Sequence, residues 1–201
     1  FRKSLKRYNI QSPSVSYQEI SREVQKAVQE RLGLLEEQMD FLRNESDHLL
    51  TFKKGEAKLI SQHEIEITNG AHKEIVWADY IVLATGSRPR NLPELPIDEK
   101  IVMTSDGIEA MTDFPESMVI VGAGVIGCEY ATIFSGFGNT KVHLIDKGDR
   151  ILPFEDEDAV RIIERNMENN GVLIHRNSRL IRMAIVNGRV EYELEYTDNT
   201  R

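Results

Sequence analysis

Three glycines followed by a distant carboxylate are the residues in this chain whose types and spacing indicate chemistry. Gly122, Gly124 and Gly127 form a GxGxxG pattern after the apolar run 118–121, and Asp146 ends a second apolar run. Gly122 permits a tight turn, Gly124 lets backbone approach a pyrophosphate, and Gly127 lets the following helix pack closely on the strand. A strand, a glycine turn, a helix and an acid-tipped strand in this order predict a dinucleotide site.

The helix expected over residues 125–137 presents free N–H groups, and the positive end of its dipole, toward phosphates. We therefore expect the backbone from Gly122 to Gly127 to hold the pyrophosphate. This stretch includes Ala123, Val125 and Ile126.

The carboxylate of Asp146 is expected to accept hydrogen bonds from an adenosine ribose. An acid here favours NAD, because it would repel the 2′-phosphate of NADP. Lys147 and Arg150 follow closely in the sequence. They could offset that repulsion by pairing with a phosphate, and a solvated basic loop is the alternative interpretation.

Composition is that of a soluble globular protein. The 201 residues are 40% hydrophobic and 29% charged, with a formal net charge of −8. This charge argues against a nucleic-acid or anionic-membrane partner, and no apolar run is long enough to cross a bilayer. Cys128 is the only cysteine, which we expect to be buried, and the five histidines lack ligand spacing. No metal site is expected, and a reducing, cytoplasmic setting fits.

Before the glycine pattern, the sequence predicts one long helix and several short strands. Ser16 and Glu19 form a plausible capping box for a helix that runs to about Asn44 and packs its apolar stripe on a core. Asn69-Gly70 predicts a hairpin turn. Strands are expected over residues 49–52, 58–61, 64–68 and 74–77, and a buried strand over residues 80–84.

A proline-bearing segment, Arg90 to Glu99, is interpreted as a linker between a first domain, 1–91, and a second domain, 92–201. In the second domain we expect a helix that Gly171 ends in the left-handed conformation and a hairpin that turns at Asn187-Gly188. The fold class is α/β: a Rossmann-like domain with a parallel sheet plus a β-hairpin meander, joined to a segment with a long helix and short strands. The expected elements are a helix over 155–169, a parallel strand over 172–174, and hairpin strands over 178–185 and 189–196.

These motifs together resemble a known family. Ala84-Thr-Gly-Ser-Arg-Pro89, the linker, and Val121-Gly-Ala-Gly-Val-Ile-Gly-Cys-Glu129 resemble the flavoprotein pyridine nucleotide-disulfide oxidoreductases. Dihydrolipoamide dehydrogenase, glutathione reductase and mercuric reductase are members. The stretch from Gly122 to Phe134 most resembles the soluble (Si-specific) pyridine nucleotide transhydrogenase branch, as do Asp149-Arg150-Ile-Leu152 and Gly171-Val-Leu-Ile-His175.

The resemblance implies an FAD domain that surrounds an inserted NAD(P) domain, followed by a dimerisation domain, so the whole protein is expected to be a homodimer. Residues 1–91 would be part of the FAD domain and 92–201 a C-terminally truncated NAD(P) domain. It also implies that Thr85 and Gly86 lie near the FAD pyrophosphate and that the backbone of Ala57 contacts the adenine. Glu129 would hold the nicotinamide carboxamide.

The implied activity is hydride transfer between NADPH and NAD through a flavin, with FAD, NAD and NADP as cofactors. We expect the 201-residue chain alone to be inactive, because the first FAD fingerprint and the CxxxxC region of the family lie outside it. A disulfide reductase like dihydrolipoamide dehydrogenase or mercuric reductase is the first alternative. A non-catalytic NAD(H)-binding sensor is the second, and the stretch from Ala84 to Pro89 argues against it.

Overall fold

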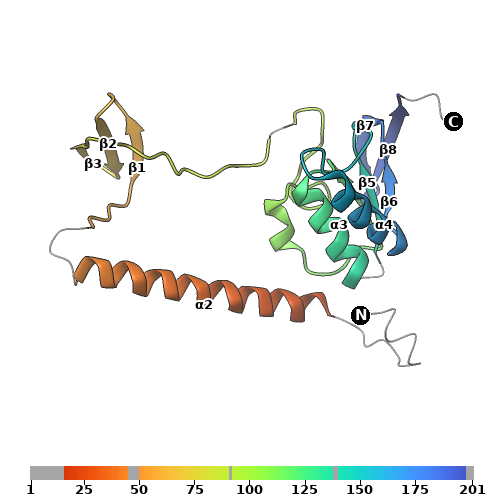
Figure 1. Ribbon diagram of the computed structural model, residues 1–201, viewed down its shortest axis with the longest axis horizontal. Coiled ribbons are helices and arrows are strands. Elements are labelled where there is room, and N and C mark those ends of the chain that lie inside the picture. The colour runs from red at the N-terminus through yellow and green to blue at the C-terminus, as the bar shows by residue number, and fades with distance from the viewer. Residues whose placement is uncertain (1–15, 45–49, 91, 138–139, 198–201) are drawn as a thin grey trace. The chain divides into compact units, whose positions relative to one another are not determined.

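The computed structural model describes residues 16–44, 50–90, 92–137 and 140–197. The chain divides into two compact units (Figure 1). One comprises Phe1–Val24 with Pro89–Arg201, and the other comprises Gln25–Arg88. The domain boundary expected between residues 91 and 92 stays a prediction.

The larger unit contains a three-stranded parallel sheet with the order β4-β5-β6. Its strands are β4 (Ser117–Val121), β5 (Lys141–Ile145) and β6 (Leu173–His175). Helices α3 (Val125–Phe137) and α4 (Glu157–Asn169) connect them, as parallel strands require crossovers. The expected α/β class is confirmed, and α3 has the predicted bounds.

The core of this unit lies between the sheet and the two helices. Phe134 of α3 and Leu144 of β5 are almost completely buried, and Val160 and Met167 of α4 pack into the same cluster. Successive residues of a strand point to opposite faces, so the side chain of His143 lies on the face away from these helices. Because both crossover helices cover the same face of the sheet, a different element covers the other face.

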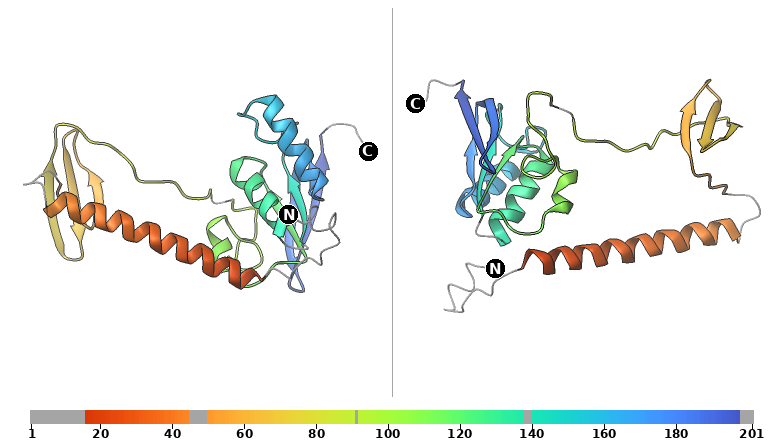
Figure 2. Two further views of the ribbon diagram at one scale, coloured as in Figure 1. Left: turned by 60° about the horizontal axis from the view of Figure 1, so that its bottom comes forward. Right: turned by 180° about the vertical axis from the view of Figure 1, so that it is seen from behind.

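That element is the antiparallel hairpin of β7 (Ser178–Val186) and β8 (Arg189–Tyr196), which lies beside β5 and β6 in both views of Figure 2. Asn187 and Gly188 form its turn with φ values of +50° and +74°, as predicted for this dipeptide. The hairpin shows one register shift, between Leu180 and Arg182.

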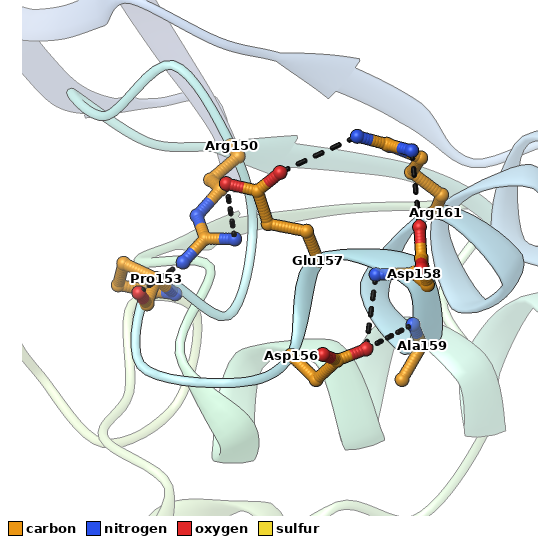
Figure 3. A network of polar contacts seen from close by, with 7 residues as sticks. All are labelled: Arg150, Pro153, Asp156, Glu157, Asp158, Ala159 and Arg161. Atoms are coloured by element: carbon orange, nitrogen blue, oxygen red, sulfur yellow. Dashed lines mark hydrogen bonds and ion pairs between the residues drawn. The ribbon is translucent and has the colours of Figure 1, made fainter.

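Helix α4 begins two residues later than predicted because Asp156 caps it. The Asp156 carboxylate accepts hydrogen bonds from the backbone N–H groups of Asp158 and Ala159 at 3.0 and 3.1 Å (Figure 3). Both donors belong to the first turn, whose N–H groups have no partner within the helix. At the other end, Gly171 adopts a φ of +90°, as expected for a residue that follows a helix C-terminus.

Helix α2 (Tyr17–Asn44) begins close to the predicted capping box, where the N–H of Glu19 donates to Ser16 Oγ at 3.4 Å. Tyr17 packs edge-on against Phe114, with ring centroids 5.1 Å apart. The expectation of a core-packing helix is wrong for the described residues, because none of the helix residues is buried. Its apolar stripe, Val24, Val28, Leu32 and Leu35, stays exposed.

In the unit Gln25–Arg88, three antiparallel strands form a sheet in the order β1-β2-β3. They are β1 (Glu56–Leu59), β2 (Glu64–Asn69) and β3 (His72–Trp77). The turn lies one residue later than predicted: Asn69 still pairs with His72, and Gly70 takes the positive φ, +60°. β1 begins two residues before the predicted strand 58–61.

Two predicted strands of this unit are wrong. Residues 80–84 have no regular structure, and Tyr80 and Val82 are 92% and 87% exposed instead of buried. Residues 50–52 are also irregular, and Leu49 lies outside the described residues. A strand needs a neighbour for its N–H and C=O groups, and no described residue of this unit pairs with either segment.

We predict that Asp156→Ala weakens α4. The substitution removes both capping hydrogen bonds, which costs about 1 kcal/mol. Amide hydrogen exchange over residues 157–169 should therefore accelerate about fivefold. Asp158→Ala is the matched control, since this carboxylate makes only an exposed ion pair with Arg161. Equal acceleration in both variants would show that capping is not the cause.

Candidate nucleotide-binding site

The glycine loop starts directly at the end of β4. Gly122 has a φ of +107°, which an L side chain rarely adopts, and its N–H donates to the carbonyl of Ile145 at 2.8 Å. This hydrogen bond joins the loop to the end of the neighbouring strand β5. The turn therefore begins where β4 and β5 end.

Gly127 brings the helix and the strand into direct backbone contact. A Cβ built on Gly127 would overlap the carbonyl oxygen of Gly122, so only a residue without a side chain fits there. A Cβ on Gly124 would meet no atom within 4 Å, so the outer side of the loop is open space. Close packing on one side and open space on the other allow an extended ligand to approach the loop backbone.

The carboxylate of Asp146 closes the corner from β5. Its Oδ2 accepts a hydrogen bond from the N–H of Ala123 at 2.6 Å, and its Oδ1 accepts one from Gly148 at 2.8 Å. Ala123 is completely buried, so its N–H is used inside the protein rather than offered to a phosphate. The exposed residues of the loop and first helical turn are Gly124, Val125 and Ile126.

The backbone of Asp146 is held by residues that sequence reasoning missed. Its N–H donates to the carbonyl of His175, and its carbonyl accepts from the N–H of Ser178, both at 2.9 Å. Ser178 is buried, and its hydroxyl donates to His175 O at 2.7 Å. A polar Asn-Ser pair just after a short apolar strand was the only signal, because Asp146 and Ser178 are 32 residues apart in sequence.

The two basic residues near Asp146 differ in their surroundings. Lys147 is exposed. The guanidinium of Arg150 donates to the carbonyl of Pro153, and it lies 3.7 Å from the Glu157 carboxylate, which also pairs with Arg161 (Figure 3). Arg150 is therefore held by its own loop and by α4.

Near its start, α3 presents Glu129 to solvent and Cys128 to the core. Glu129 is exposed, so it is accessible to a ligand. The Cys128 thiol lies 3.5 Å from the carbonyl of Ala123, and burial, followed by the charges of Asp146 and Glu164, raises its pKa to about 11. The expectation of a buried cysteine is confirmed, and the thiol is uncharged at neutral pH.

The residues proposed for FAD lie in the other unit. Ala57 sits in β1, paired with Ile67, after a glycine whose Cβ would come within 2.8 Å of Ile67 and Thr68. Thr85 and Gly86 are exposed and lie in a segment without regular structure, although Gly86 has a φ of +73°. The described residues of this unit thus assemble no cradle for FAD, whereas the corner at Asp146 fits a dinucleotide.

Two other classes of site are absent from the described part of the chain. It holds no group of three or more His, Cys, Asp or Glu side chains that could bind a metal ion. None of its helices is long and apolar enough to span a membrane.

Gly127→Ala should disrupt the corner. The added methyl group overlaps backbone, which side-chain rotation cannot relieve, and overpacking of this kind costs about 1–3 kcal/mol. Gly136→Ala is the control, because the same methyl group on the same helix meets nothing within 4 Å and improves helix propensity. Hydrogen exchange over residues 125–137 should accelerate in the first variant only, and equal protection in the two would refute the packing role.

The sequence pattern of the pyridine nucleotide-disulphide oxidoreductase family matches residues 5–201. A dihydrolipoyl dehydrogenase from Bacillus subtilis is 41% identical over 130 residues, which are 65% of this chain and 28% of that protein. A soluble pyridine nucleotide transhydrogenase from Hahella chejuensis is 39% identical over 127 residues, or 63% of this chain and 27% of that protein. The chain thus spans little more than a quarter of these relatives.

Solved structures agree on the fold. LpdA from Mycobacterium tuberculosis superposes with a TM-score of 0.80 at 22% identity, covering 96% of this chain and 42% of that one. The HOCl-induced flavoprotein disulfide reductase RclA from Escherichia coli superposes with a TM-score of 0.58 at 26% identity, covering 70% of this chain and 32% of that one. With the glycine corner and these likenesses in place, the chain belongs to the pyridine nucleotide-disulphide oxidoreductase family, whose members are oxidoreductases that use FAD and NAD(P) as cofactors.

Proposed function

We propose that this chain supplies the NAD(P)-binding site of an FAD-dependent oxidoreductase that transfers hydride between NADPH and NAD, as a soluble transhydrogenase does. The observation that carries the proposal is the corner itself. Asp146 lies 2.6 Å from the Ala123 amide, beside the open space at Gly124. The names of several relatives, which are soluble pyridine nucleotide transhydrogenases, support the reaction class.

In this proposal the first turn of α3 binds the pyrophosphate. The N–H groups of Gly124, Val125 and Ile126 lie at a helix N-terminus, where backbone donors lack partners and the helix dipole favours negative charge. Ala123 contributes indirectly, since its N–H orients the Asp146 carboxylate instead of contacting phosphate. The sequence pattern instead predicts that the backbone of Ala123 holds the pyrophosphate directly.

The Asp146 carboxylate keeps capacity for a ribose. Each carboxylate oxygen offers two acceptor sites, and each oxygen accepts one backbone hydrogen bond here. One free site per oxygen suits the two hydroxyls of an adenosine ribose. Because both oxygens are already oriented by the backbone, little side-chain entropy is lost when they bind.

Hydride transfer depends on where the nicotinamide lies, and fixing the pyrophosphate and the ribose determines this position. Glu129, exposed near the start of α3, is proposed to accept a hydrogen bond from the carboxamide N–H₂ of the nicotinamide. The flavin, when bound, supplies the hydride-accepting chemistry. Thr85, Gly86 and Ala57 are proposed for FAD on the resemblance alone.

Binding of NADP requires a cation to offset Asp146. We assign this role to Lys147 before Arg150, because Lys147 is exposed while Arg150 is occupied by Pro153 and Glu157. Nη1 of Arg150 has no hydrogen-bond partner among the described residues, but it is buried and lies 3.7 Å from the Glu157 carboxylate, so a phosphate would have to displace that carboxylate to reach it.

A second candidate reaction is that of a disulfide reductase, which the name of the Bacillus subtilis relative favours at 41% identity. Assays of the whole protein distinguish the two reactions by their substrates. A transhydrogenase reduces thio-NAD with NADPH and leaves dihydrolipoamide unused. Reduction of NAD by dihydrolipoamide, without transfer from NADPH to thio-NAD, would replace the first proposal by the second.

We expect the chain to bind NADH about tenfold more tightly than NADPH, a difference of about 1.4 kcal/mol that reflects repulsion between Asp146 and the 2′-phosphate. Asp146→Asn should weaken NADH binding and remove this preference, because the amide is neutral and accepts at only one of its two terminal atoms. Nucleotide fluorescence titrations measure both affinities.

Lys147→Gln is the matched control for charge, and it should weaken NADPH binding while it leaves NADH binding within about twofold. If the unsubstituted chain binds neither nucleotide, the proposed site itself is wrong. If it binds both equally, the carboxylate does not determine the choice of nucleotide.

A further inference from the structure

Two histidines from neighbouring parallel strands meet on the face of the sheet that the hairpin covers. Nδ1 of His143, on β5, lies 3.1 Å from Nε2 of His175, at the end of β6. The ring planes are 8° apart, and the ring centroids are 5.3 Å apart. This N–N distance is that of a hydrogen bond between the two imidazoles, in which one nitrogen donates and the other accepts.

Two tyrosines of the hairpin extend this contact. The hydroxyl of Tyr196 lies 2.6 Å from Nδ1 of His175, and the hydroxyl of Tyr192 lies 3.3 Å from Nδ1 of His143. Both tyrosines belong to β8. The histidine pair (His143 and His175) therefore connects the parallel sheet to the hairpin through side chains that hydrogen-bond.

The number of protons decides whether this connection holds. With both rings neutral, Tyr196 donates to His175 Nδ1, and His175 Nε2–H donates to His143 Nδ1. The Tyr192 hydroxyl, 3.3 Å away, competes for the one lone pair of that same nitrogen. One added proton on His175 Nδ1 keeps the contact with the hairpin, because that N–H then donates to the Tyr196 oxygen. A second proton would place N–H groups on both facing nitrogens, so the hydrogen bond between the rings is lost. Two cations would then face each other across 3.1 Å, and their repulsion drives the rings away from the hairpin hydroxyls that they contact.

Few charges near the pair oppose this effect. Alternation along β8 places Tyr192, Leu194 and Tyr196 toward the sheet and the glutamates of β8 on the other side. Ser178 and Leu180 of β7 pair with Tyr196 and Leu194 and share their inward side. On β5, the charged group on the same face as His143 is Lys141, two residues before it. On β6, the residue two positions before His175 is the apolar Leu173. No carboxylate among the described residues of these strands therefore faces the pair.

We propose that the histidine pair is an acid-sensitive switch, which holds the β7–β8 hairpin against β5 and β6 while it carries at most one added proton and releases the hairpin when both rings are protonated. The geometry carries this inference: two facing imidazole nitrogens, two hydroxyls from the hairpin, and no facing carboxylate among the strand residues that the structure describes. The proposal does not rest on nucleotide binding, although His175 and Ser178, the first residue of β7, also hold the backbone of Asp146.

The direction of the pH effect follows from His175. Burial, and then the neighbouring His143, lower the pKa of His175 below its ordinary value of 6.5. Below pH 6.5 the unfolded chain thus binds more protons than the folded chain, so the free energy of unfolding decreases as the pH falls. The contribution is complete above 6.5 and is lost as the pH passes down through the lowered pKa.

Hydrogen exchange over residues 189–196 of the 201-residue chain tests the switch. After correction for the intrinsic effect of pH, protection should fall about tenfold between pH 7.0 and pH 5.0. In His143→Gln the fall should be clearly smaller, because the second cation is removed, although the burial of His175 remains. Protection of β2 and β3, in the other unit, serves as the internal reference, and His72→Gln, at an exposed histidine of β3, is the matched control.

An NMR titration of the histidine rings in the unsubstituted chain tests the same proposal without a variant. The pair should titrate in two separated steps, with the second step coinciding with the loss of protection in β8. Two independent transitions near pH 6.5, or protection in β8 that does not change across this range, would overturn it. A similar loss of protection in His143→Gln would also overturn it.

Discussion

The contact on which the larger unit depends is the hydrogen bond from the Ala123 amide to the Asp146 carboxylate, 2.6 Å long. It joins the loop after β4 to the end of β5, at the point where Gly122 also donates to Ile145. A buried amide must find an acceptor, and here the acceptor is a charged side chain, which makes the bond stronger than a neutral one. The proposed nucleotide site is therefore organised before any ligand binds.

The two faces of the parallel sheet are covered through different kinds of interaction. On one face α3 and α4 bury aliphatic and aromatic side chains, each of which contributes about 1.5–3 kcal/mol when fully buried. On the other face the hairpin is held in part by hydrogen bonds among two imidazoles and two phenols. Apolar packing is insensitive to pH, whereas imidazole contacts are not, so the two faces respond differently to acid.

In the unit Gln25–Arg88, some segments do not adopt the structure that their local sequence pattern predicts. The strands β2 and β3 lie close to where their alternation predicts them, because a short hairpin can satisfy its own hydrogen bonds. The apolar run at residues 80–84 has the composition of a buried strand but is exposed, and so is the stripe of α2. The composition of a segment indicates whether it can be buried. Burial also requires another surface for it to pack against, and the described residues of this unit offer none.

The sequence by itself determined the local features: the bounds of α3, the positive φ of Gly122 and Gly171, and the turn at Asn187-Gly188. Each follows from the torsional freedom of glycine and asparagine or from a periodic pattern within one segment. Only the tertiary structure decided that Asp146 binds the Ala123 amide and that His143 meets His175 across two strands. These partners are 23 and 32 residues apart, and only the pairing of parallel strands brings them within hydrogen-bonding distance.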